Sequence, residues 1–186
     1  MTLRNTAGRF SMACACWLAI MVVAAVALRG AAQTKPVPPV APAALQKLLP
    51  AVDGWTSGVA RADLVDISPE NKYSFASTTF TKDDARVKLT IADTGFSADS
   101  LAALATMVMS MPEDYSGTVG GMAIKRSLIG GSPGVEAWDA QKSAGEVNVV
   151  VGGRFVVAVE SAKIDSVATL RAMADRVDLK ALAALK

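Results

Sequence analysis

The chain has 186 residues, 52% of them hydrophobic, and its 19 lysines and arginines nearly balance its 17 acids. It contains no histidine, which excludes imidazole as a general base, as a metal ligand and as a proton switch near neutral pH. Both cysteines, Cys14 and Cys16, lie in an N-terminal apolar run. If that run is removed, thiolate nucleophiles, zinc–thiolate sites and disulfides are excluded as well.

Residues 1–32 are predicted to be a signal peptide. Arg4 and Arg9 precede an apolar run over residues 12–28, and small residues follow up to Ala32. This order is typical of an exported chain that is cleaved, here after Ala32. The run of 17 residues is just long enough to span a bilayer, so an uncleaved membrane anchor is the alternative.

Cleavage would change the charge of the protein. It removes three arginines and no acid, so the net charge falls from +2 to −1. Such a domain has no basic field to attract nucleic acid or an anionic membrane surface, and neither is expected as a partner. Without cysteines the domain must be held by its core, and about 150 residues are enough for that.

The rest of the chain is predicted to be a single α+β domain, an antiparallel sheet of about six strands with helices packed on it. Residues 33–42 form a proline-rich linker, and residues 43–186 contain no second linker and no repeat. In chain order, the predicted elements are a helix over 43–49, strands over 73–81 and 86–93, a helix over 97–109, strands over 123–128, 135–140, 146–151 and 154–160, and two C-terminal helices.

Four residues indicate where the predicted helices begin. Ser97 is expected to cap the helix over 97–109, and Phe96 before it completes a hydrophobic staple. Asp165 and Asp178 are expected to cap the two C-terminal helices.

The Gly152-Gly153 pair predicts a hairpin between the last two strands. With a two-residue turn, Val151 lies opposite Arg154 and both faces of the hairpin are largely apolar. We therefore expect the hairpin in the centre of the sheet, covered on both faces by helices. If only one face is covered, the other face is a dimer interface or an apolar ligand cleft.

Arg126 is a candidate ligand-binding residue. It alternates with Ile124 and Leu128, which places its charge on an apolar face of the strand. Pairing with a carboxylate such as Asp139 or Glu136 is the simpler interpretation. The functional interpretation is that Arg126 lies in a cleft and binds an anion.

Trp55 and Trp138 are the other two candidate ligand-binding residues, since aromatic side chains serve both cores and binding surfaces. No catalytic motif, metal site or cofactor is predicted. The methionines of residues 107–111 have the spacing of a Cu(I) site on a strand, but the segment is predicted to be helical, where flexible methionines fill a core. Ser127 beside two basic residues leaves a hydrolase using carboxylates or Ser/Lys as an alternative.

Two motifs resemble a group of small exported bacterial proteins. The first reads LLP…GW over residues 48–55, and the second reads RFVVAVE…VDLKAL over residues 154–182. The resemblance covers most of residues 46–185. It implies export and a single α+β domain and carries over no site residue. The Gly-Trp start is also similar in layout to PsbP-like and Mog1-like α+β domains.

The expected function is that of an exported domain, periplasmic or extracellular, that binds a partner protein or a small ligand without catalysis or a cofactor. A homodimer is compatible with this expectation. The two alternatives are a membrane-anchored envelope accessory protein with an uncleaved N-terminal helix, and the hydrolase.

Overall fold

A computed structural model describes residues 37–68, 71–95 and 100–185. By its contacts the chain divides into Met1–Ala32 and Gln33–Lys186, and every described residue belongs to the second unit. Within the described ranges, no helix is long and apolar enough to cross a membrane. The expected cap at Ser97 and the staple residue Phe96 lie outside the described residues.

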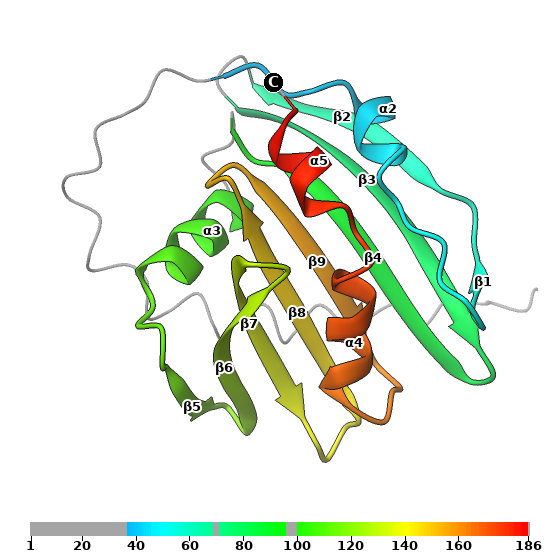
Figure 1. The fold of residues 1–186 in the computed structure, drawn as a ribbon, viewed down its shortest axis with the longest axis vertical. Coiled ribbons are helices and arrows are strands. Elements are labelled where there is room, and N and C mark those ends of the chain that lie inside the picture. The colour runs from blue at the N-terminus through cyan, green and yellow to red at the C-terminus, as the bar shows by residue number, and fades with distance from the viewer. Residues whose placement is uncertain (1–36, 69–70, 96–99, 186) are drawn as a thin grey trace, which may run out of the picture. The chain divides into compact units, whose positions relative to one another are not determined.

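Across the described residues, the domain is built on one antiparallel sheet of nine strands (Figure 1). The strands are β1 (Thr56–Ser57), β2 (Arg61–Ser68), β3 (Asn71–Lys82), β4 (Ala85–Asp93), β5 (Ser116–Val119), β6 (Met122–Ile129), β7 (Ser132–Asp139), β8 (Ala144–Val151) and β9 (Phe155–Ser161). Their order is β1-β3-β4-β9-β8-β7-β6-β5, and β2 also pairs with β3. The α+β prediction is confirmed. The prediction of about six strands was too low, because β1, β2 and β5 were missed.

Four helices complete the described fold: α2 (Pro42–Gln46), α3 (Ser100–Ser110), α4 (Val167–Ala174) and α5 (Leu179–Ala183). In Figure 1, α4 and α5 cross in front of the sheet. α2 packs over β2 and β3 on the same face, and α4 packs over β8 and β9. α3 packs on the opposite face, against β7 and β8.

The β8–β9 hairpin lies in the centre of the sheet and is buried on both faces, as predicted. We call the face under α2, α4 and α5 the large-core face, and the face under α3 the small-core face. Six hairpin residues contribute to the large core: Val147, Val149, Val151, Phe155, Val157 and Val159. Val150 and Val156 contribute to the small core together with Ile124, Val135 and Ala137.

The predicted register of this hairpin was wrong by one residue. Val151 lies opposite Phe155, so the connection has three residues and Arg154 is one of them. Gly152 and Gly153 have φ values of +60° and +68°, a left-handed backbone that glycine adopts without steric cost. Because side chains alternate along a strand, the shift moves Phe155 and every later residue of β9 to the face opposite the predicted one.

The caps of the C-terminal helices differ in one place from the prediction. The side chain of Ser166, not that of Asp165, accepts a hydrogen bond from the backbone of Ala168 and caps α4. Asp178 caps α5, as predicted, by accepting from the backbone N–H of Ala181 at 2.9 Å.

Candidate functional site

A buried ion pair joins the end of β4 to the β8–β9 turn. Asp93 is fully buried, and the side chain of Arg154 is 18% exposed. Arg154 Nε donates to Asp93 Oδ1 at 2.8 Å and Nη2 donates to Oδ2 at 2.7 Å. This two-point geometry is the strong form of an arginine–carboxylate contact.

The same ion pair holds the N-terminal segment of the described chain. The backbone N–H of Val40 donates to Asp93 Oδ2 at 2.7 Å, and that of Gly95 donates to Oδ1 at 3.0 Å. Arg154 Nη2 also donates to the carbonyl of Pro38 at 2.9 Å. The buried carboxylate is therefore fully hydrogen-bonded, which is the condition for burying a charge. The result is that the end of the predicted linker is fastened to the sheet.

Close packing around Arg154 requires glycine at position 95. A Cβ atom there would lie 2.9 Å from Arg154 Nε. The backbone of Arg154 is fixed as well, because its carbonyl accepts from both the N–H and the hydroxyl of Thr94, at 2.9 and 2.6 Å. This arginine is occupied by structural contacts and is not free to bind an anion.

An open hollow of about 580 Å³ lies where the β3–β4 turn meets the start of α4. Its lining comes from four separate segments and combines one aromatic ring with three carboxylates and two ammonium groups. The lining residues are Trp55, Lys82, Asp83, Asp84, Ala85, Ser143, Lys163, Ile164, Asp165 and Thr169.

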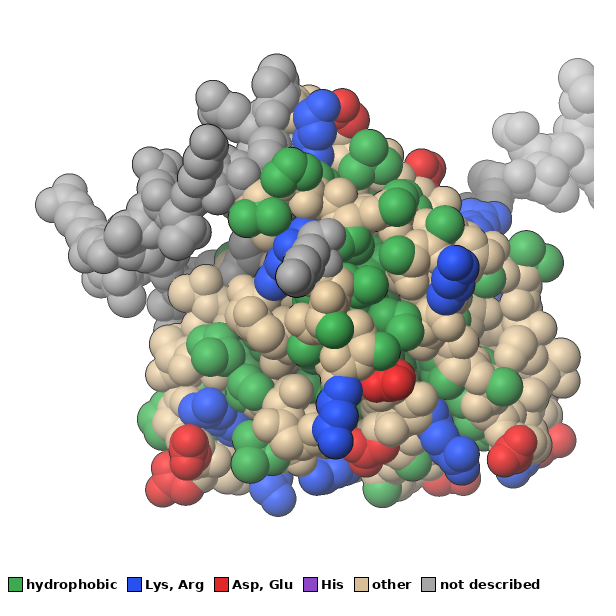
Figure 2. Space-filling view, turned by 45° about the horizontal axis from the view of Figure 1, so that its top comes forward, with side chains coloured by type: hydrophobic (Ala, Val, Ile, Leu, Met, Phe, Trp, Pro, Cys, Tyr) green, Lys and Arg blue, Asp and Glu red, His purple; other side chains and the backbone are tan. Residues whose placement is uncertain are grey.

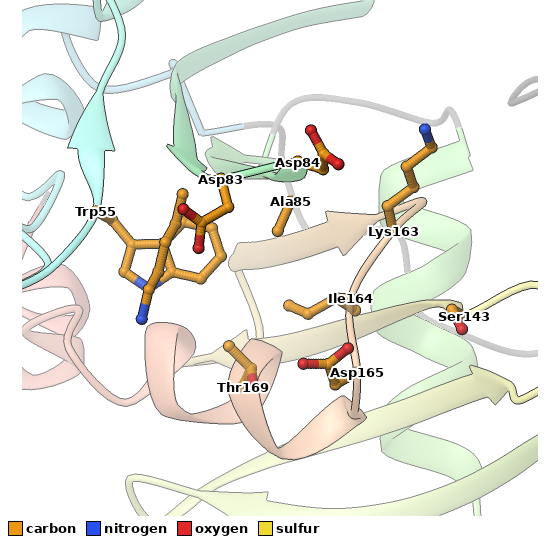
Figure 3. A pocket seen from close by; sticks show the side chains of 10 residues that line it. Trp55, Asp83, Asp84, Ala85, Ser143, Lys163, Ile164, Asp165 and Thr169 are labelled. Atoms are coloured by element: carbon orange, nitrogen blue, oxygen red, sulfur yellow. The ribbon is translucent and has the colours of Figure 1, made fainter.

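Figure 3 shows how these side chains are arranged. Trp55 stands on one side of the hollow, and Lys163 and Ser143 stand on the other. Trp55 is half-buried and also packs against the large core, so its position is fixed by the fold. Two turns that shape the hollow have a left-handed residue that is not glycine, Asp83 with φ +52° and Ser143 with φ +48°.

The three candidate residues from the sequence do not form one site. Only Trp55 lines the hollow. Trp138 is half-buried against the large core, with its ring close to Gly145. Arg126 donates to the carbonyl of Met111, just after α3, and its own N–H donates to the carbonyl of Tyr115. Its partner is thus the backbone after α3, and the predicted carboxylate partners engage other residues.

Those two carboxylates have partners of their own. Asp139 binds Lys142 at 2.7 Å, and this hydrogen bond is the main reason why the pKa of Asp139 lies below its ordinary value. Glu136 Oε1 accepts from the hydroxyl of Ser127 at 2.7 Å and from Arg171 Nη1 at 2.9 Å. The oxygen that would remove a proton from Ser127 therefore also carries an ion pair with α4.

A second group of charged residues lies on the small-core face. Glu146 on β8 and Glu160 on β9 are directly opposite each other, and Glu160 binds Lys88 of β4 at 2.9 Å. Burial, and secondly the charge of Glu160, raise the pKa of Glu146. A hydrogen bond with Asn148 acts in the opposite direction. Glu146 therefore holds its proton more strongly than an exposed glutamate does.

Across the described ranges, no three His, Cys, Asp or Glu side chains come together as a metal site. Figure 2 shows basic and acidic side chains interspersed along the lower part of the face it draws, without a field of one sign. No protein-family model, curated protein or solved structure matches the chain.

Most residues of the buried ion pair and of the hollow were not predicted from the sequence. One signal for the buried ion pair was present: Asp93 continues the alternation of Val87, Leu89 and Ile91, so it falls on an apolar face and needs a partner. No local signal identifies that partner. The hollow is built from turns, and the acids Asp83 and Asp84 have the ordinary composition of a solvated turn.

Proposed function

We propose that this chain is an exported, non-catalytic α+β domain that binds a small ligand in the hollow between Trp55 and Lys163. The observation that carries the proposal is the hollow itself. Its volume of about 580 Å³ falls within the range of small-molecule sites, and it combines an aromatic ring with both signs of charge.

Export is supported by the N-terminal sequence. Two arginines, an apolar run and small residues ending at Ala32 have the order of a cleaved signal peptide. The resemblance to small exported bacterial proteins supports the same destination, periplasmic or extracellular. The ion pair between Asp93 and Arg154 would then fasten a proline-rich linker, starting at Gln33, to the domain.

The lining predicts the chemistry of the ligand. Three carboxylates and two ammonium groups favour a molecule that carries both a cationic and an anionic group. Trp55 adds an apolar surface over which a short hydrocarbon part or a cation can lie. An exposed loop of a partner protein presents the same groups, and the mass of the bound species separates the two.

A non-catalytic role is supported by the side chains near the candidate nucleophile. The chain has no histidine, and residues 33–186 have no cysteine. Ser127 contacts a carboxylate, but Arg171 binds the same oxygen of Glu136. That arrangement joins α4 to β6 and β7 and gives the contact between Ser127 and Glu136 a structural role.

Native mass spectrometry of the protein purified from the envelope of its own host tests the proposal. We expect a bound mass in the range of a small metabolite that is lost in Lys163→Glu and in Trp55→Ala. The control is Trp138→Phe, because Trp138 packs on the same core outside the hollow. Absence of any bound mass, or a mass that survives Lys163→Glu in a folded protein, would contradict the proposal.

A further inference from the structure

β2 forms an outer edge of the sheet and carries exposed apolar side chains. Within the described ranges it pairs with β3 alone. Leu64 and Ile67 on this strand are 45% and 61% exposed, and Val59, two residues before it, is 91% exposed. An outer strand with apolar side chains is a template for pairing with another strand, and here the N–H of Leu64 donates to Asp63 Oδ1 at 2.8 Å, a bond that pairing would exchange.

We propose that β2 pairs antiparallel with β2 of a second copy of this chain, with the two-fold axis passing through Ala62. The two sheets then continue into each other. This inference does not depend on the hollow or on its ligand, so it is tested independently of the proposed function.

The charges on β2 select this register. When two copies of one strand pair antiparallel about a two-fold axis, directly opposite side chains lie on the same face of the sheet. One residue must therefore lie opposite its own copy, and the axis passes midway between these two equivalent residues. An axis at Arg61 places two arginines opposite each other, and an axis at Asp63 places two aspartates opposite each other. An axis at Leu64 leaves Asp63 opposite Val65.

An axis at Ala62 makes both charges complementary. Arg61 of each copy then lies opposite Asp63 of the other, giving two ion pairs across the axis. The same register places Val59 opposite Val65 of the second copy and Ala60 opposite Leu64, which covers exposed apolar side chains. The charges of this edge thus favour the register centred on Ala62 and disfavour the two adjacent registers, centred on Arg61 and Asp63. Specific strand pairing is achieved by such a combination of attraction and repulsion.

Analytical ultracentrifugation of the purified full chain, with and without charge exchange, tests this register. We expect a reversible dimer whose Kd rises at least about tenfold in Asp63→Arg and in Arg61→Asp, because each places like charges opposite each other. The double variant, Arg61→Asp with Asp63→Arg, restores the opposite charges and should return the Kd to within about threefold of the original. Asp175→Arg, directly after α4, is the matched control and should leave the Kd unchanged.

Disulfide trapping gives a second measurement that does not depend on affinity. Directly opposite residues have Cβ atoms about 4.5–5.5 Å apart, within reach of a disulfide after a small backbone shift, so Ala62→Cys should form an intermolecular disulfide under mild oxidation. A Cys14→Ser and Cys16→Ser background removes the natural thiols. Ala123→Cys on β6 is the control and should form no intermolecular disulfide. A protein that is monomeric at all concentrations, a dimer unaffected by Asp63→Arg, or an Ala62→Cys variant that does not crosslink would overturn the proposal.

Discussion

Arg154 and Asp93 form a two-point ion pair between residues 61 apart in the sequence, with distances of 2.8 and 2.7 Å. The pair lies where three segments meet: the end of β4, the β8–β9 turn and residues 38–40. One buried carboxylate therefore sets both the shape of the central hairpin and the place where the N-terminal segment joins the domain.

Removal of the arginine should be strongly destabilising. Arg154→Met leaves the Asp93 carboxylate buried without its cation, and we expect a loss of about 3–5 kcal/mol in the free energy of unfolding. Urea denaturation measures this loss. Lys72→Met is the control, because the Lys72–Asp66 pair is exposed and should cost about 0–1 kcal/mol. Equal losses in the two variants would contradict the role given to the buried pair.

Glu146→Gln should change the stability in a pH-dependent way. Burial and the charge of Glu160 raise the pKa of Glu146, so the folded state binds this proton more tightly than the unfolded state. The stability from this proton is fully present below the unfolded-state pKa and is lost as the pH rises through the folded-state pKa. Glu146→Gln should therefore raise Tm at pH 7 and leave it nearly unchanged at about pH 3.

Thermal melts at the two pH values measure this difference. The control is Glu113→Gln, an exposed glutamate outside the sheet, for which we expect no pH-dependent change. A Glu146→Gln variant whose Tm shifts equally at both pH values would show that the effect comes from packing and not from the proton.

Substitution of Ser166 and of its neighbour Asp165 should affect the stability differently, because only Ser166 caps α4. The hydroxyl of Ser166 accepts from the N–H of Ala168 at 3.1 Å, so Ser166→Ala should cost about 1 kcal/mol of unfolding free energy. Asp165 is exposed and makes no cap in the structure, so Asp165→Ala should cost clearly less. Chemical denaturation of both variants decides between them, and the reverse order would favour the cap predicted from the sequence.

The part of the fold that the sequence predicts is the part with a strong apolar pattern. All six predicted strands are present, and in β4, β8 and β9 the apolar pattern of the sequence matches a buried face of the sheet. β2 was missed because it is an edge strand in which Arg61, Asp63 and Asp66 interrupt both faces. β5 was missed because it has four residues.

The hairpin register and the sites depend on contacts between distant residues. The local sequence of two glycines predicts a two-residue turn, but Arg154 leaves the strand to reach Asp93, and the pairing shifts by one residue. The hollow similarly joins Trp55 to turns that are far away in the sequence, such as the one at Lys163. Such contacts are formed by the tertiary fold and leave no pattern within a window of neighbouring residues.

The intact mass of the protein in fractions of its own host tests whether this chain is exported and folds as a domain beginning near Gln33. We expect a chain that starts at Gln33 and is recovered from the periplasm or the medium. Recovery of the unprocessed chain from the soluble cytosolic fraction would contradict it, and an unprocessed chain in the membrane fraction would establish the anchor instead.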